Sequence, residues 1–92
     1  VSGVQWPRWS HDGMRLAVQL YDGARKGVSS IGVVNIATGK IDIVTPHDQP
    51  YGDETPSWFP DGKRIAFQSN RTGKMEGWGM KADGPGRRQL TR

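Results

Sequence analysis

The chain has 92 residues, a formal net charge of +4 at pH 7, 34% hydrophobic residues, four tryptophans and no cysteine. This length allows one domain at most, near the margin of independent stability. The lack of cysteine excludes a disulfide framework and thiolate metal sites. The lysines and arginines are scattered, which favours ordinary solubility over a nucleic-acid footprint. No apolar run approaches transmembrane length and no signal-peptide pattern opens the chain.

The first half of the chain predicts four short strands joined by turns. The strands are expected at residues 4–11, 15–21, 31–36 and 40–45. Asp12-Gly13 is typical of a hairpin turn, because Asp can bond its own backbone and Gly tolerates positive φ. In the second strand Leu16, Val18 and Leu20 alternate with small or polar residues. One bulky and one small face suit a strand that lies between neighbouring sheets.

The second half of the chain repeats this order. Its strands are expected at residues 55–59, 64–69, 76–82 and 87–91, after an irregular stretch that ends at Thr55. Five pairs of identical residues lie 49 positions apart: Trp9 and Trp58, Asp12 and Asp61, Gly13 and Gly62, Ala17 and Ala66, and Gln19 and Gln68. Later in the unit the offset falls to 46, as between Val34 and Met80. A repeat of this period is typical of solenoids, propellers and arrays.

Each repeat is therefore predicted to be four antiparallel strands, the size of one propeller blade. The predicted fold is all-β, a β-propeller unit of two four-stranded antiparallel blades. We expect the first blade over residues 4–45, a linking loop over 46–54 and the second blade over 55–92. No stretch has the periodicity of a helix.

The residues that carry the repeat resemble a known family. Both copies contain Pro-x-Trp, then Asp-Gly-x-Arg and Ala, and the second copy continues with Ser69-Asn70-Arg71 and with Met80 to Gly84. This pattern resembles the WD-repeat-like blades of TolB-type propellers. Two features depart from it, since His11 stands where the second copy has Pro60, and glycines interrupt the predicted third strand. The resemblance implies an extracytoplasmic, often periplasmic, bacterial setting and protein partners.

Two blades are too few for a closed propeller, because known propellers have four to eight. Each blade packs through both faces, so a two-blade unit would leave two apolar faces wet. Three chains in a head-to-tail ring would give six blades, and we expect this homotrimer because the chain ends after a predicted fourth strand at Thr91. Other ring sizes and a fragment of a longer propeller are the alternatives. A start at Val1 rather than Met is compatible with a processed protein or a fragment.

Three polar loops follow even-numbered strands and are expected on one end of the ring, where loops on a rigid scaffold bind partners. The residues predicted to bind a ligand or partner there are His47, Tyr51, Asp53, Glu54, Arg25 and Arg71. Asp53-Glu54 is the best acidic pair and could hold a cation or a basic group. We predict no catalytic residue, no metal site and no cofactor. His11-Asp12 is interpreted as turn chemistry and not as an acid–base pair.

The tryptophans are the expected anchors of the core. Trp6, Trp9 and Trp58 lie on or beside the predicted innermost strands and should pack between blades. Trp78, between two glycines, is expected to be exposed as a partner contact.

The favoured function is a non-catalytic propeller scaffold that presents loops at a channel mouth to bind a protein, peptide or small ligand, with self-association and without nucleic acid or membrane insertion. The alternative is a fragment of a larger propeller, such as the accessory propeller of a prolyl-oligopeptidase-like or tricorn-like peptidase. A channel-centred sugar hydrolase or lyase is disfavoured, because the predicted innermost strands offer few carboxylates or histidines.

Overall fold

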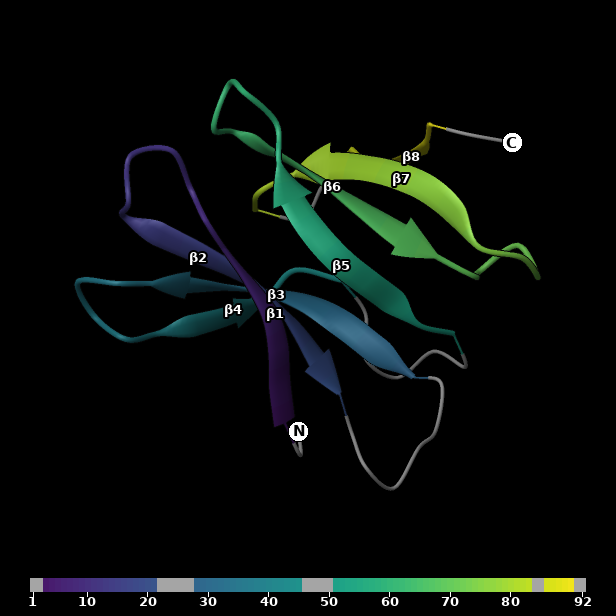
Figure 1. The fold of residues 1–92 in the computed structure, drawn as a ribbon, viewed down its shortest axis with the longest axis horizontal. Helices are drawn as coiled ribbons and strands as arrows, with labels where there is room; N and C mark the ends of the chain where they lie inside the picture. The colour runs from purple at the N-terminus through teal and green to yellow at the C-terminus, as the bar shows by residue number, and fades with distance from the viewer. Residues whose placement is uncertain (1–2, 22–27, 46–50, 84–85, 91–92) are drawn as a thin grey trace.

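The computed structural model describes residues 3–21, 28–45, 51–83 and 86–90. It contains two four-stranded antiparallel sheets, each with its strands in chain order (Figure 1). Sheet 1 consists of β1 (Gly3–Trp9), β2 (Arg15–Tyr21), β3 (Ser29–Asn35) and β4 (Ile41–Ile43). Sheet 2 consists of β5 (Asp53–Trp58), β6 (Arg64–Ser69), β7 (Glu76–Lys81) and β8 (Arg88–Gln89). Among these residues there is no helix that could span a membrane. The all-β prediction with two four-stranded sheets is confirmed.

The strand boundaries differ from the predicted ones mainly at the outer and first strands. β5 begins at Asp53, two residues before the predicted start of the second repeat, so Asp53 and Glu54 belong to a strand and not to the linking loop. β4 and β8 are shorter than predicted, with three and two residues. Both are edge strands, where pairing on one side only favours short segments.

The two predicted hairpin turns have the same construction. Gly13 and Gly62 have φ of 72° and 68°. Oδ1 of Asp12 accepts the backbone N–H of Met14, and Oδ1 of Asp61 accepts that of Lys63, both at 2.9 Å. The repeated Asp-Gly pair therefore forms the same turn twice.

Each first strand also contains a bulge that the sequence analysis did not predict. The pairing register shifts between Gln5 and Arg8 in β1, and between Glu54 and Ser57 in β5. Trp6 and Thr55, which lie at corresponding positions before a proline, have positive φ of 54° and 46°. Proline cannot donate to the ladder, and extra residues in a bulge are left unpaired. The two strands thus share one unusual backbone path.

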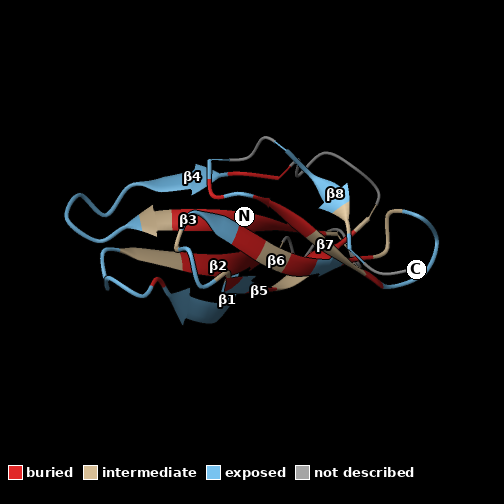
Figure 2. Ribbon diagram, turned by 90° about the horizontal axis from the view of Figure 1, so that it is seen from above, coloured by how far each residue is buried: buried red, intermediate tan, exposed pale blue. Residues whose placement is uncertain are grey.

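The core lies between the sheets. The bulky face of sheet 2 presents Trp58, Ile65, Phe67 and Met80, and it packs on the small face of sheet 1, which includes Ala17, Ile31 and Val33. β5 is the strand of sheet 2 that contacts β1, β2 and β3. Figure 2 shows buried residues concentrated along β2, β3, β6 and β7, with β4 and β8 largely exposed. We call this sheet-to-sheet contact the seam.

The opposite faces of the two sheets expose several described side chains, although Val18 and Leu20 in the middle of the bulky face of sheet 1 are buried. The bulky face of sheet 1 exposes Val4, Trp9, Ile41 and Ile43. Trp9 is 60% exposed and Trp6 52%, whereas Trp58 is 9% exposed. The prediction that Trp6, Trp9 and Trp58 all pack between sheets is therefore right only for Trp58. The physical reason is that the seam covers the other face of sheet 1, and Trp9, paired with Leu16, lies on the face opposite to it.

Candidate functional site

The predicted site residues separate into three groups. Arg25 and His47 lie outside the described residues. Tyr51, Asp53 and Arg71 come together at the end of sheet 2 where β5 begins and β6 ends. Glu54 does not join them, because it follows Asp53 in an extended strand and neighbouring side chains point to opposite faces.

Asp53 and Arg71 form a buried ion pair. The Asp53 side chain has no exposed surface, and Nη2 of Arg71 donates to its Oδ1 at 2.8 Å and its Oδ2 at 3.0 Å. Nε of Arg71 donates to Oγ of Ser69 at 2.9 Å. A charge-assisted contact of this kind is strong and positions both side chains. The Asp53 carboxylate is thus already paired within the protein.

Three aromatic rings surround the Arg71 guanidinium. Its carbon lies 4.7 Å from the ring centroid of Tyr51, 4.6 Å from that of Trp78 and 5.6 Å from that of Phe67. Stacking of this kind suits the planar guanidinium. Trp78 is half-buried in this stack, and its indole Nε1 is buried without a hydrogen-bond partner among the described residues. The expectation of an exposed Trp78 is wrong, because its ring packs on Arg71.

Hydrogen bonds to backbone groups also stabilise this end of the molecule. Oδ1 of Asn70 accepts the N–H of Gly52 at 2.8 Å, and the N–H of Asn70 donates to the Gly52 carbonyl. Oγ of Ser29, in sheet 1, donates to the Asp53 carbonyl at 2.9 Å. These contacts fix the bases of the polar segments at this end, which we call the loop end. Its β6–β7 turn exposes Thr72, Lys74 and Met75.

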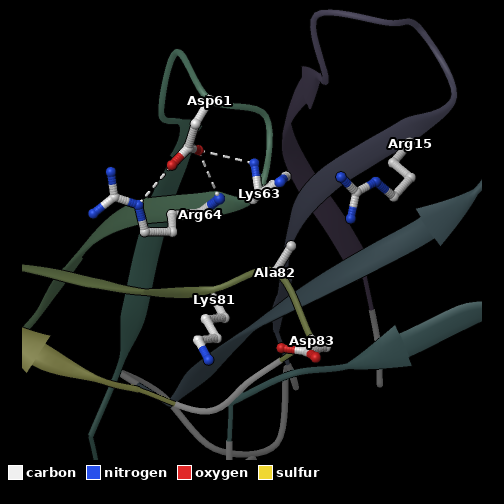
Figure 3. A pocket seen from close by; sticks show the side chains of 7 residues that line it. All are labelled: Arg15, Asp61, Lys63, Arg64, Lys81, Ala82 and Asp83. Atoms are coloured by element: carbon white, nitrogen blue, oxygen red, sulfur yellow. Dashed lines mark hydrogen bonds and ion pairs between the residues drawn. The ribbon is translucent and has the colours of Figure 1, made fainter.

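A hollow lies at the opposite, hairpin end of the seam (Figure 3). Its volume is about 410 Å³, and its lining residues are Arg15, Asp61, Lys63, Arg64, Lys81, Ala82 and Asp83. Nη2 of Arg15 crosses from sheet 1 to the Gly62 carbonyl at 2.6 Å, and its guanidinium lies over the Trp58 ring at 4.8 Å. Nε of Arg64 pairs with Oδ2 of Asp61 at 2.8 Å. This hollow has no signal in the sequence, since its lining residues come from both repeats.

The carboxyl groups in the two hairpin turns have lowered pKa values. Hydrogen bonds from the Ser10 hydroxyl and the Met14 N–H lower the pKa of Asp12 below its ordinary value of 3.8. The Lys63 N–H and then the Arg64 side chain lower that of Asp61 in the same way. Both carboxylates are engaged in their turns. Among the described residues, no group of three or more histidines and carboxylates could hold a metal ion.

Comparison with known proteins gives relatives of one type. No protein-family model matches the chain. An uncharacterised protein of Agrobacterium fabrum is 34% identical over 86 residues, which cover 94% of this chain and 28% of that protein. The Tol-Pal system protein TolB of Francisella tularensis is 38% identical over 64 residues, which cover 70% of this chain and 14% of that protein. The chain thus spans less than a third of the length of these relatives.

Solved structures give the same result for the fold. A protein assigned as TolB from Agrobacterium tumefaciens superposes with a TM-score of 0.84 at 28% identity, covering 98% of this chain and 31% of that one. The β-propeller domain of the trilobed protease from Pyrococcus furiosus superposes with a TM-score of 0.71 at 18% identity, covering 100% of this chain and 30% of that one. The second likeness concerns the fold alone. The chain is therefore similar, in sequence and in fold, to a part of TolB-type β-propellers.

Proposed function

We propose that the chain is a non-catalytic, TolB-type propeller scaffold, in which the two sheets act as two blades and the loop end binds a protein, peptide or small ligand. One observation carries the proposal. The Asp53–Arg71 pair and its aromatic stack fix the base of the loop end, while the described β6–β7 turn exposes Thr72, Lys74 and Met75. A rigid frame under variable loops is the usual arrangement of a binding surface.

Ring closure is part of this proposal. The exposed bulky face of sheet 1 supports it, because an open face of this kind is typical of an interaction surface. Blades outside these 92 residues would complete the ring. We favour copies of this unit in a six-bladed homotrimer over other ring sizes, and further blades in a longer chain are the competing source.

The proposal also includes a cellular compartment and the lack of an enzymatic role. We place the scaffold in an extracytoplasmic, periplasmic compartment, in line with its similarity to TolB. We assign no enzymatic role, since Asp53, the most buried carboxylate among the described residues, is already paired with Arg71. The role of an accessory propeller beside a peptidase remains the second hypothesis, but the likeness to the trilobed protease extends only to the fold.

A displayed random-peptide library tests the binding surface without a known ligand. Peptides selected on the purified chain should slow amide hydrogen exchange at residues 51–54 and 70–75, because these segments form the loop end. A T72A/K74A variant, which changes only exposed side chains of one turn, should weaken the selected peptides. Peptides that protect only the open sheet faces, or a selection that yields none, would contradict the proposed binding surface.

A further inference from the structure

The hollow at the hairpin end of the seam lies at the opposite end of the molecule from the proposed binding surface. Its volume of about 410 Å³ falls within the range of small-ligand sites, roughly 300–1,000 Å³. Its lining carries four cationic side chains and two carboxylates, so its formal charge is +2, four less two. A concave site with one sign of charge concentrates ligands of the opposite sign. The hollow therefore favours an anionic ligand.

One of the two carboxylates is already neutralised within the protein. Oδ1 of Asp61 accepts the backbone N–H groups of Lys63 and Arg64 at 2.9 Å and 3.2 Å. Its Oδ2 pairs with Nε of Arg64 at 2.8 Å. Within the described ranges, the side-chain amines of Lys63 and Lys81 take part in no ion pair. The cations that remain therefore outnumber the one remaining carboxylate, that of Asp83.

Arg15 is the cation of the hollow whose position is fixed from sheet 1. Its guanidinium carbon lies 4.8 Å from the centroid of the Trp58 ring, and its Nη2 donates to the Gly62 carbonyl at 2.6 Å. This contact occupies one N–H group of the five that a guanidinium carries. The planar fork of donors matches the oxygens of a phosphate group. One wall of the hollow is thus a guanidinium that is held in place before a ligand binds.

The hairpin end of sheet 1 has the same backbone construction without the two lysines. Met14 stands at the position of Lys63, beside the same Asp-Gly turn. Asn35 stands at the position of Lys81, in the same register between the second and third strands. Because this turn and strand pair form with methionine and asparagine, the local fold requires neither lysine. The two lysines occur only in the repeat whose hairpin borders the hollow.

One of these lysines also carries an electrostatic cost. Lys81 lies directly opposite Arg64 in the β6–β7 pair, whereas the neutral Asn35 lies opposite Arg15 in the β2–β3 pair. Like charges directly opposite each other on neighbouring strands destabilise a sheet. An anion bound in the hollow would offset this repulsion. A ligand therefore accounts for a charge pair that the fold does not need.

The small side chain of Ala82 leaves room in the hollow. Ala82 and Ile36 occupy corresponding positions, since the N–H of Ala82 donates to the Lys63 carbonyl as that of Ile36 donates to the Met14 carbonyl. Ala82 is one of the lining residues of the hollow. An isoleucine at this position would occupy part of the volume, so the second repeat carries the smaller residue where a ligand needs space.

We propose that this hollow binds a small, hydroxylated phosphate monoester. Figure 3 shows Arg15 and Lys63 on one side of Ala82, and Lys81 and Asp83 on the other. Arg15 and Lys63 contact the phosphate oxygens, Lys81 adds positive potential, and Asp83 accepts a hydroxyl group of the organic part. A phosphate monoester carries a charge of about −1.5 to −2 at pH 7, which matches the formal charge of the lining.

Isothermal titration calorimetry with glycerol 3-phosphate tests this site. The wild-type chain should bind the ester saturably, and more tightly than acetate at the same ionic strength. K63M/K81N gives the second repeat the residues of the first and should weaken binding at least about tenfold, because charge-assisted contacts are lost. The matched control K40Q/K74Q removes two lysines outside the hollow and should change the affinity less than about twofold, since distant charges are screened.

A82I provides a second variant that keeps every charge of the lining. It introduces the residue that the first repeat has at this position, and it should abolish saturable binding by filling the hollow. Urea unfolding of each variant shows whether it is folded. Unchanged binding in folded A82I would overturn the placement of the ligand in the hollow. If A82I does not fold, K63M/K81N and its control still decide the question.

Three further results would overturn the inference. They are a wild-type chain that does not bind the ester saturably, equal losses in K63M/K81N and K40Q/K74Q, and acetate binding as tight as that of the ester. Vesicles that contain phosphatidic acid present the same monoester on a membrane, and binding to these vesicles alone would overturn the small soluble ligand. Each of these results leaves the peptide selection at the loop end unaffected, so the two binding surfaces are tested separately.

Discussion

Trp58 and Trp9 are the same residue of the same repeat in two different environments. Trp58 is buried in the seam, donates to the Arg8 carbonyl and lies under Arg15. Trp9 lies on the open face of sheet 1, 60% exposed. The local strand and turn are alike in both copies, so the difference comes from the neighbouring sheet alone. Each repeat therefore carries the residues for packing against a neighbouring sheet, and among the described residues this packing occurs once, at the seam.

Replacing the two tryptophans should give the largest difference in stability between the two environments. W58A should lower the free energy of unfolding by about 3–5 kcal/mol, since it leaves a cavity in the seam and an unpaired Arg8 carbonyl. W9A should cost less than about 0.5 kcal/mol in dilute protein, where its face is open. Urea unfolding of both variants measures the difference. Equal losses would contradict the assignment of the two environments, and W58F provides a milder variant if W58A does not fold.

The buried ion pair gives the next effect. D53N should cost about 3 kcal/mol, because it leaves the guanidinium of Arg71 with a neutral partner in a buried setting. The matched control is E54Q, on the adjacent strand residue, which should change stability by less than about 0.5 kcal/mol. Denaturant unfolding of the two variants checks this. A loss in E54Q as large as that in D53N would show that the pair at Arg71 is not the feature that holds the loop end.

The two glutamines give a smaller effect of the same kind. Q19A should cost about 1 kcal/mol, because it removes the acceptor of the Thr55 N–H in the seam. Q68A should be nearly neutral in dilute protein and should act only where two copies meet. Thermal unfolding at low concentration measures both. A neutral Q19A would mean that the contact to Thr55 adds no net stability.

The smallest effect concerns the two turns, where the sheets should not differ. The folded-state pKa values of Asp12 and Asp61 are lowered, so each carboxylate adds stability above its ordinary pKa of 3.8 and loses it as the pH falls through the lowered value. D12N and D61N should each flatten the acid side of the stability curve below about pH 4. Denaturant unfolding measured at several pH values between about 2.5 and 6, on both sides of the ordinary Asp pKa, checks this. A steeper acid decline in either variant would contradict the sign.

Much of the fold could be predicted from the sequence, because the same pattern of strands and turns occurs in both repeats. The Asp-Gly turns and the alternation of Leu16 and Val18 with Ala17 predict the hairpins and the two unlike faces. The bulges at Trp6 and Thr55 were missed, although a proline after each was the available signal. Trp9 is exposed because no described sheet packs on its face, and the residues around Trp9 do not indicate whether a neighbouring sheet is present.

The candidate site was predicted less well than the fold. Tyr51, Asp53 and Arg71 do lie together, but sequence alone could not show that Asp53 is buried by its ion pair. Its position in the first residue of β5, beside Ser69, decides this, and strand ends are poorly defined by sequence. The hollow at the hairpin end takes Arg15 from the first repeat and its other lining residues from the second, so no linear motif indicates it.

Sedimentation equilibrium of the wild-type chain over a wide concentration range tests the central claim, that the two open faces are the two halves of one contact. We expect a mass that rises above the 10.2 kDa of one chain toward three times that value, and a shift of the rise to higher concentration in W9A. A mass that stays at one chain throughout, or an assembly that W9A leaves unchanged, would contradict it.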